Sequence, residues 1–318
     1  EVVNFPEVSR SELYKSYDKC EKIFNSLMSE LTAALNFVHG SNYSFRAWDI
    51  ILGRWLREFI QNCEKSFQLI NYALKNYNIE KIYSLDYRSY DFVVDDTLSA
   101  TIALSDNEWF FCFSSSLLNY LQPKFKIVKT SPKQRAFTIS PDEYSDRVAA
   151  IRNNYSRFIY KFLRSTLSFF RSDKDAFIDA SYLPLFTEKM LELKFFQIPQ
   201  LWLNNQINYK SGNQIARSKI KLMTHSNQED LERFVRINLA KFIPRFVLEN
   251  FSDIKKLAEN GKFPKNPRFI FTSSSHHFDE VFKFYAANKI EQKTPLYIGQ
   301  HGNNEFSKIH HSYLSEWN

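Results

Sequence analysis

The spacing of apolar residues in the first part of the chain predicts two long helices. Over residues 10–38, apolar side chains recur at steps of three and four residues, which is the period of one face of an α-helix. The same spacing extends over residues 47–77, where Trp48 and Trp55, seven residues apart, are expected to share a face in the core. Residues 39–44 form a polar turn between the helices, and its last serine can cap the second one.

Shorter elements follow in the middle of the chain. Residues 82–85 and 125–129 are brief apolar runs that indicate strands. Helical spacing covers residues 97–104, 109–121, 145–170 and the first part of 182–203. Residues 204–213 are polar and weakly patterned, so we place a domain boundary at this point. The predicted domains are residues 1–210, a helix-rich α/β domain, and residues 211–318.

The last hundred residues contain the clearest supersecondary pattern. Residues 267–272 are a short apolar run bounded by proline and serine, as a buried strand is, and residues 294–299 indicate a second strand. A polar turn at residues 273–277 and an amphipathic helix at residues 278–290 connect them. Together they predict a β-α-β unit, and therefore an α/β fold with a parallel sheet covered by helices.

Composition limits the kinds of site that the chain can contain. Glycine accounts for 6 of 318 residues, whereas phenylalanine and tyrosine number 31 and 17. Neither GxxxxGK[ST] nor GxGxxG occurs, which excludes a P-loop and a dinucleotide fingerprint. Aromatic rings must therefore supply much of the core. The apolar runs fall short of the roughly 20 residues that a membrane-spanning helix needs.

Charge and cysteine content leave several partners open. With 42 Lys and Arg against 35 Asp and Glu, the net charge is +7, which suits a mixed solvated surface, nucleic acid, an anionic membrane face or a phosphorylated substrate. The absence of long runs of like charge disfavours nucleic acid. The odd number of cysteines, Cys20, Cys63 and Cys112, favours a reducing compartment over a disulfide framework or zinc cluster. The chain opens with neither a secretory signal nor Met, so we expect a cytoplasmic protein and an excised segment.

Polar residues follow both strands of the C-terminal unit at their carboxyl ends, where open α/β sheets bind ligands. These are residues 272–277 after the first strand and residues 299–302 after the second. Ser274 or Ser275 is expected to cap the next helix, whose N-terminus attracts an anion such as phosphate. The alternative is that these serines are caps and nothing more.

Three of the seven histidines lie in the same two loops. His276 belongs to the first loop and His301 to the second, where Gly302 permits a sharp turn that can bring backbone N–H groups to a ligand. A histidine satisfied within its turn is the alternative. No metal site is expected, because His276 and His277 are adjacent and no carboxylate or thiol follows at ligand spacing.

Two other clusters are candidates for chemistry. Arg46 and Asp49 have the spacing of a helical ion pair, although Arg46 at a helix start can also contact an anion or sugar.

Asp86 follows the strand at residues 82–85 and is the favoured general base or nucleophile, with loop solvation as the alternative for its acidic neighbours. Those neighbours are Asp91, Asp95, Asp96, Asp106 and Glu108. We interpret Asp173, Asp175 and Asp179 as capping residues and surface charge.

Several of these motifs resemble a family of bacterial surface-polysaccharide transferases. Residues 42–48 and 53–56 resemble its YSxRYWxxLxGPWL stretch. Further similarities, in the same order, are residues 106–109 to DEWN, 271–276 to FTSNSH, 297–302 to IGQHGG and 312–317 to DRYLTWGW. The matches run from about residue 36 to the end of the chain.

The resemblance implies a GT-B-like fold of two Rossmann-like domains, with residues 1–210 on the acceptor side and residues 211–318 beginning the nucleotide-sugar domain. It implies a donor site formed by Ser274, Ser275, His276, Gln300 and Gly302. It makes Asp86 and His301 the catalytic candidates, and Tyr43, Arg46 and Trp48 acceptor contacts or structural residues. Asp49, Arg54 and Asn303–Asn304 depart from the family motifs, and the chain stops at Asn318, so we expect an incomplete C-terminal domain.

The function implied is a glycosyltransferase of surface-polysaccharide biosynthesis that needs neither a metal nor a cofactor. Its donor would be a nucleotide-sugar, with a CMP-activated sugar such as Kdo favoured, and its acceptor an oligosaccharide or a lipid-linked glycan. We expect it in the cytoplasm, with peripheral contact to the inner membrane and no nucleic-acid partner. The alternative is a non-catalytic protein of the same pathway that binds nucleotide-sugars or glycans.

Overall fold

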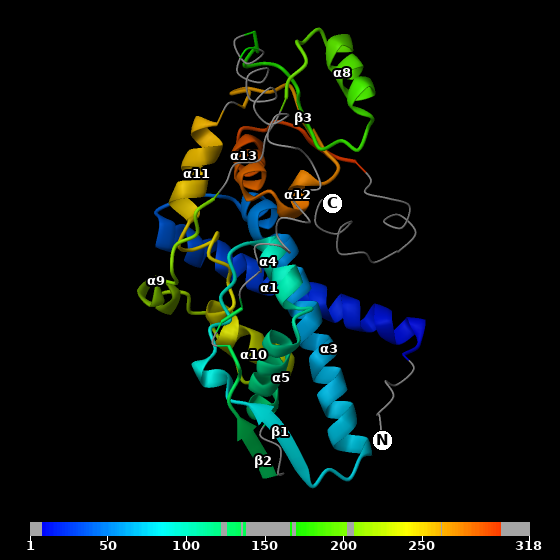
Figure 1. The fold of residues 1–318 in the computed structure, drawn as a ribbon, viewed down its shortest axis with the longest axis vertical. Coiled ribbons are helices and arrows are strands. Elements are labelled where there is room, and N and C mark those ends of the chain that lie inside the picture. Colours follow the sequence, from blue (N-terminus) through cyan, green and yellow to red (C-terminus); the bar gives the residue numbers. More distant parts are fainter. Residues whose placement is uncertain are drawn as a thin grey trace. The chain divides into compact units, whose positions relative to one another are not determined.

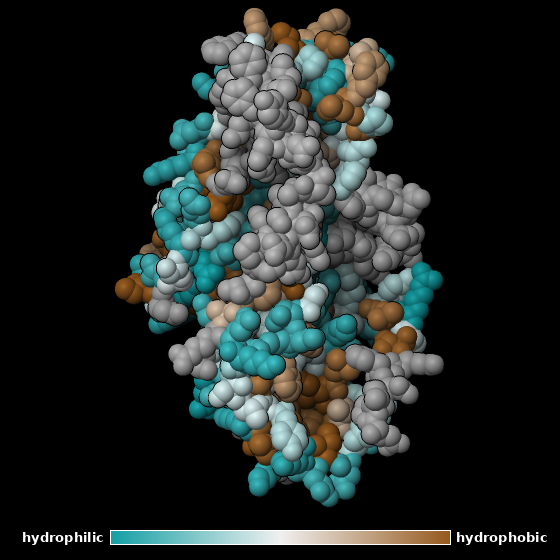
Figure 2. Space-filling model, viewed as in Figure 1, coloured by the Kyte–Doolittle hydropathy of each residue, from teal (hydrophilic) through white to brown (hydrophobic). Residues whose placement is uncertain are grey.

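The computed structural model describes residues 8–121, 126–134, 136–137, 166, 170–201, 207–261 and 263–299. Within this part, helices predominate and the paired strands are parallel, so the predicted mixed α/β class is confirmed (Figure 1). None of the described helices is long and apolar enough to cross a membrane. Hydrophilic side chains cover much of the face shown in Figure 2.

The chain forms two compact units from non-contiguous segments. Unit 1 consists of Glu1–Phe45, Leu52–Phe137 and Tyr209–Glu249, and unit 2 of Arg46–Ile51, Thr138–Asn208 and Asn250–Asn318. The chain passes from unit 2 to unit 1 between Asn208 and Tyr209, within the stretch where the sequence predicts a boundary. The division into residues 1–210 and 211–318, with acceptor and donor roles, stays a prediction, as does the GT-B arrangement.

Long helices form the framework of unit 1. The first predicted helix is confirmed as α1, Arg10–His39. It begins at a capping box, in which the Glu12 N–H donates to Ser9 Oγ at 3.2 Å and the Ser9 N–H donates to Glu12 Oε2 at 2.8 Å. It ends at Gly40, whose φ of 59° is a left-handed conformation that glycine adopts without strain. Helix α3, Arg54–Asn76, packs against α1.

The second predicted helix is interrupted. It consists of α2, Phe45–Trp48, a π-helical turn at Asp49–Gly53, and then α3. The wider π turn changes the direction of the residues that follow it. Trp48 stacks on Phe251 in unit 2, and Trp55 stacks on Phe59 in unit 1. The predicted burial of both in the core is confirmed, with 0% and 4% exposed, but the prediction of one shared face is wrong.

The remaining elements of unit 1 include a two-stranded sheet. Strands β1, Lys81–Leu85, and β2, Lys126–Thr130, pair in parallel, which confirms both predicted strands. The shorter helical elements are η2 at Tyr87–Ser89, α4 at Thr97–Ala103, α5 at Asn107–Leu121, α9 at Gln214–Ser218, α10 at Asp230–Asn238 and η3 at Leu239–Lys241. Helix α10 is tied to α1 by Arg236, whose Nη1 lies 2.5 Å from Glu30 Oε1.

Unit 2 contains a three-stranded parallel sheet in sequence order. Its strands are β3, Phe177–Asp179, β4, Ile270–Thr272, and β5, Leu296–Ile298. Its helices are α8 at Leu185–Lys194, α11 at Phe251–Asn260, α12 at Ser275–Phe278 and α13 at Glu280–Glu291. The β-α-β unit of the sequence is thus confirmed as β4 and β5 with α13 between them. The helix predicted at residues 145–170 lies almost entirely outside the described residues.

Aromatic rings fill the core of unit 1, as the composition predicts. The ring of Phe242 is at the centre of this cluster, with ring centroids 4.8–6.1 Å from those of Phe92, Phe59, Phe113 and Trp109. Phe242 is 3% exposed, so its area is almost entirely removed from water. Helices α3 and α5 and the loop that contains Phe92 therefore meet at this one side chain, which follows η3.

We therefore predict that Phe242→Ala lowers the free energy of unfolding by about 3–5 kcal/mol, because it removes a buried ring and leaves a cavity. Urea unfolding followed by circular dichroism measures this change. Phe37→Ala is the matched control, because Phe37 is 80% exposed and its removal should change stability by less than about 0.5 kcal/mol. Equal effects of the two substitutions would contradict the prediction.

Candidate functional site

Three strands of unit 2 end at the same edge of its sheet. The register places Asp179 opposite Thr272, and Thr272 opposite Ile298. The next residue, Gly299, donates its N–H to the Thr272 carbonyl at 2.8 Å. Because the strands are parallel, the residues that follow all three gather at one edge, which is where α/β proteins bind ligands. We call this group of residues the carboxyl edge.

Thr272 organises the loop after β4. Its Oγ1 accepts the N–H of Ser275 at 2.9 Å and the N–H of Ser274 at 3.3 Å, so Thr272 is the side chain that caps α12. Ser274 occupies the N-cap position of α12, as predicted, but its side chain makes no capping hydrogen bond, so a capping role for a serine side chain is wrong. The predicted turn at residues 273–277 is partly helical, and α13 begins beyond it with Asp279 as its cap, whose Oδ1 accepts the Phe282 N–H at 2.9 Å.

Ser275 instead bonds across the sheet. Its hydroxyl donates to Asp179 Oδ2 at 2.6 Å, which links the end of β3 to the start of α12. Burial raises the pKa of the Asp179 carboxyl, and the nearby Glu188 raises it further, while the bond from Ser275 and the charge of Lys189 act in the opposite direction.

Asp179 is the functional candidate that the sequence analysis missed. It was interpreted as surface charge because it follows Asp173 and Asp175 at short spacing. The informative signal was Ala176-Phe177-Ile178, a three-residue apolar run that ends in an acid and proves to be a buried strand. Asp175 fits the capping interpretation, since its Oδ2 accepts the Ser172 N–H at 2.9 Å.

His276 and His277 follow Ser275 at the carboxyl edge and are both buried. Their exposed fractions are 2% and 4%, and their ring centroids lie 3.8 Å apart. An imidazole can donate an N–H whether it is neutral or charged. The sequence analysis identified His276 correctly as a residue of this edge; its role stays a prediction.

Acidic groups adjoin the histidines. Burial raises the pKa of Asp279 to about 7, and the charges of Asp179 and Glu280 add to the increase, while the Phe282 N–H and Lys283 lower it. Glu280 and Lys283 form an ion pair of 3.0 Å in which each side chain is 1% exposed. The carboxyl edge is therefore a place where several titratable groups lie close together.

Gly299 lets two loops of this edge approach each other closely. A Cβ on Gly299 would collide with Ser273 Oγ and lie 2.8 Å from Phe271 Cζ. The Ser273 hydroxyl is itself fixed, because it donates to the Ser181 carbonyl at 3.1 Å. The glycine is thus required by packing between β4 and β5. Gln300, His301 and Gly302, the other predicted residues of this loop, lie outside the described residues.

The N-terminal candidates have structural partners. Trp48 is fully buried, and its ring centroid lies 5.5 Å from that of Phe251. The Tyr43 N–H donates to Asn36 Oδ1 at 3.0 Å, and Asn36 Nδ2 donates to the Tyr43 carbonyl at 2.8 Å. Arg46 Nη1 lies 3.8 Å from Asp49 Oδ2, as the ion-pair interpretation predicts.

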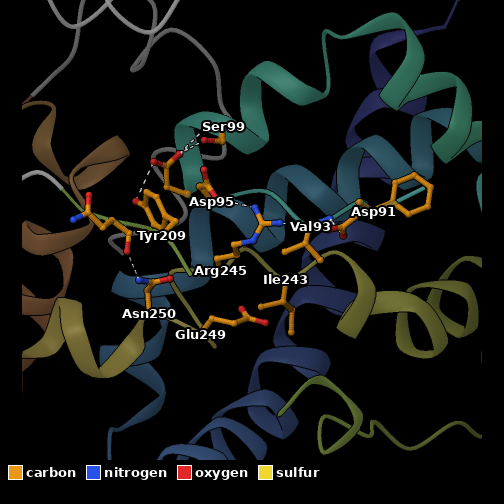
Figure 3. Close-up of polar contacts among 12 residues, drawn as sticks. Asp91, Val93, Asp95, Ser99, Tyr209, Ile243, Arg245, Glu249 and Asn250 are labelled. Carbon is orange, nitrogen blue, oxygen red and sulfur yellow. Dashed lines mark hydrogen bonds and ion pairs between the residues drawn. The ribbon is translucent and has the colours of Figure 1, made fainter. Parts of the chain in front are cut away.

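The acidic residues after β1 are mostly used within unit 1 (Figure 3). Arg245 Nη1 donates to Asp95 Oδ1 at 2.7 Å, and Asp91 Oδ1 accepts the Val93 N–H at 3.0 Å. Asp96 Oδ1 caps α4 by accepting from the N–H of Ser99 at 2.7 Å, and its Oδ2 accepts from Tyr209 at 3.1 Å.

The next two acids fix the start of α5. Asp106 Oδ1 accepts the Trp109 N–H at 2.7 Å, and Glu108 Oε1 accepts the Gln134 N–H at 2.6 Å. These acidic side chains are therefore bound within the fold, and the alternative that they are only solvated loop residues is wrong. Asp86 directly follows β1, and its N–H donates to the Thr130 carbonyl at 2.8 Å. Asp86 belongs to unit 1 and the carboxyl edge to unit 2, so the catalytic role of Asp86 stays a prediction.

Residues of two sequence motifs, 53–56 and 106–109, line a narrow pocket in unit 1. Trp55 and Trp109 line it together with Glu58, and aromatic side chains close it. The cavity is about 10 Å³, room for about one water molecule. Glu58 is held by Arg54 at 2.9 Å and by the Thr101 hydroxyl at 3.1 Å. These motif residues therefore contribute to packing. Among the described residues, no group of three or more His, Cys, Asp and Glu is arranged to hold a metal ion.

Comparison with protein families matches residues 1–314 to the LIC12162 family transferase. The chain belongs to the LIC12162 transferase family. The match includes every described residue of both units, so the carboxyl edge lies within a transferase. No curated protein and no solved structure matches the chain.

We predict that Gly299→Ala destabilises this LIC12162 family transferase by about 1–3 kcal/mol, because the added methyl group overpacks the contact with Ser273 and Phe271. Thermal unfolding measures the change. Gly212→Ala is the matched control, since the atom nearest to its Cβ would lie 3.9 Å away. A loss of stability in Gly212→Ala as large as in Gly299→Ala would contradict the explanation.

A second prediction concerns pH. The folded protein binds the Asp279 proton more tightly than the unfolded chain, so this group's contribution to stability falls as pH rises from about 4 through about 7. Asp279→Asn keeps an oxygen to cap α13 but carries no charge. Its stability relative to wild type should therefore rise over this window, by on the order of 1–3 kcal/mol, and stay constant above it. A difference that is equal at pH 4 and pH 8 in thermal unfolding would refute the assignment.

Proposed function

We propose that this LIC12162 family transferase is a glycosyltransferase of bacterial surface-polysaccharide biosynthesis. The observation that carries the proposal is the carboxyl edge, where Thr272 ends the parallel strand β4 and Ser275 and two buried histidines follow it. Hydroxyl and imidazole groups at such an edge suit the phosphate of a nucleotide-sugar. The motif resemblance favours a CMP-activated donor, such as a Kdo donor, and a glycan or lipid-linked acceptor.

The reaction would proceed by substitution at the anomeric carbon. The acceptor hydroxyl oxygen forms a bond to this carbon, the bond from the carbon to the phosphate oxygen breaks, and the nucleotide leaves with the electron pair. A carboxylate takes the acceptor proton, and Asp86 is our candidate for that role. His276 and His301 would donate hydrogen bonds to the departing phosphate, which lowers the barrier by stabilising its developing charge.

The bond between Asp179 and Ser275 offers a way to tune the same site. When the Asp179 carboxyl is ionised, Ser275 donates its proton to it. When the carboxyl is protonated, it can donate to Ser275 Oγ, and the serine proton is then free to bond to a phosphate oxygen. The raised pKa of Asp179 favours this second arrangement over a wider pH range than an ordinary aspartate would.

Asp179→Asn tests this arrangement, because an amide can donate to Ser275 Oγ at every pH. We expect nucleotide affinity in the wild type to fall as pH rises through the pKa of Asp179, and affinity in Asp179→Asn to change little over the same range. Calorimetric titration with CMP at a series of pH values measures both. Parallel pH profiles of the two proteins would refute the arrangement.

The transferase assignment itself is tested by turnover. A panel of nucleotide-sugars should include one that raises the melting temperature, because a ligand that binds only the folded state stabilises it. Release of the nucleotide from that donor then measures transfer. We expect His276→Ala to reduce kcat/KM by roughly 10- to 100-fold, since it removes one hydrogen bond to a charged group.

His225→Ala is the control, because His225 is exposed and lies in unit 1. Unchanged kcat/KM in a folded His276→Ala protein would overturn the role of this histidine. Donor binding without turnover, with any acceptor offered, would overturn the enzyme assignment and favour a non-catalytic nucleotide-sugar-binding protein.

A further inference from the structure

Helix α8 turns three of its charged side chains, Glu188, Lys189 and Glu192, inward and most of its large apolar side chains outward. The Glu192 side chain is 1% exposed and that of Lys189 is 17% exposed. Large apolar residues on and beside the helix remain in contact with solvent: Tyr182 64%, Leu185 57%, Phe186 77%, Met190 40%, Leu193 49% and Phe196 98%. We call these six residues the outer face of α8. In Figure 2, tan and brown side chains gather where α8 lies in Figure 1.

The inward charges hold the helix in this orientation. Lys189 Nζ bonds to Glu192 at 2.6 Å, to Glu188 at 2.8 Å and to the Gln200 carbonyl at 2.5 Å. Glu192 also accepts the Gln200 N–H at 2.7 Å. Because buried charges are stable only when they are paired, rotating α8 to bury its apolar side chains would break this network. The exposed apolar face is therefore specified by the sequence.

The backbone at both ends of α8 presents aromatic residues to solvent. Tyr182 has a φ of 60° and Phe196 a φ of 58°, a left-handed conformation that residues other than glycine rarely adopt. Such strain persists where a surface has a function that requires it. Phe196, at 98% exposed, gains nothing from contacts within unit 2 that would offset this cost.

Among residues 182–198 and the neighbouring Arg268, the exposed charges have one sign. Residues 182–198 are all described, and none of their acidic side chains is exposed, since Glu188 and Glu192 bond to Lys189. Lys194 at the end of α8 is exposed. Arg268, also exposed, donates to the Phe195 carbonyl at 2.7 Å and so lies at the same border. The face is apolar at its centre and cationic at its edge.

We propose that the outer face of α8 docks on the surface of an anionic phospholipid bilayer. Apolar side chains that insert at the boundary between headgroups and acyl chains, with basic residues beside them, are what binds a protein to such a surface. A second copy of the chain is a poorer occupant, because a symmetric pairing through this face would bring the same cations together. The proposal rests on α8 alone and is independent of the reaction that the carboxyl edge performs.

Co-sedimentation with vesicles tests the proposal. The full chain is mixed with phosphatidylcholine vesicles that contain phosphatidylglycerol and, separately, with vesicles of phosphatidylcholine alone. We expect tighter binding to the anionic vesicles, and binding at least about tenfold weaker in the double variant Phe186→Ser/Phe196→Ser, which removes two inserted rings. Lys194→Glu should weaken binding at low salt and have little effect at about 0.5 M salt.

Phe37→Ser is the matched control, because Phe37 is 80% exposed but lies in α1 of unit 1. Thermal unfolding checks that the double variant is folded, which its exposed positions favour. Failure of the wild type to bind anionic vesicles would overturn the proposal, as would equal binding by the double variant. A wild type that sediments as a dimer and a double variant that is monomeric, with no vesicle binding by either, would reassign the face to contact between copies.

Discussion

Parallel pairing of β3, β4 and β5 is the constraint on which the candidate site depends. In a parallel sheet, every strand ends at the same edge. Asp179 and Thr272 are therefore neighbours although they are 93 residues apart in the sequence. Thr272 then starts α12 with its hydroxyl, and this brings Ser275 within 2.6 Å of the Asp179 carboxylate. Without the pairing, these groups would be unrelated polar residues in two separate segments of the chain.

The scarcity of glycine is compatible with this site because most of its close contacts are made by small hydroxyl side chains. The hydroxyls of Ser273 and Ser275 donate to a carbonyl and a carboxylate, as the N–H groups of a glycine-rich loop could. The Thr272 hydroxyl accepts from the Ser275 N–H. One glycine is nevertheless required, at Gly299, where β5 meets Ser273. The rest of the volume is filled by rings, as at Phe242, which need no close approach of the backbone.

Periodicity predicted the fold better than it predicted the site. Helix α1 and strands β1, β2, β4 and β5 follow from apolar spacing or short apolar runs in the sequence. Burial supports this for α1 and β4, whereas β2 and β5 contain no fully buried residue. The spacing of Trp48 and Trp55 misled, since one π turn changes the direction of all residues after it. Asp179 was misjudged because its strand is three residues long, too short for a pattern to distinguish it from a loop. Thr272 can cap α12 only because β4 ends at this residue. Apolar spacing does not predict the end of a strand to within one residue, so this role could not be predicted.

The interleaving of the two units has a consequence for synthesis of the chain. Unit 1 requires Tyr209–Glu249 and unit 2 requires Asn250–Asn318, so no single cut yields either unit whole. During translation, Trp48 emerges about 200 residues before Phe251, a delay of roughly 10–40 s at ordinary rates of elongation. For that time a tryptophan that is fully buried in the finished protein lacks the ring it stacks on. Unit 1 therefore cannot be completed before Glu249 has been synthesised, and unit 2 only after residues beyond Asn250 have followed. Until then, exposed aromatic surface makes the nascent chain a substrate for chaperones.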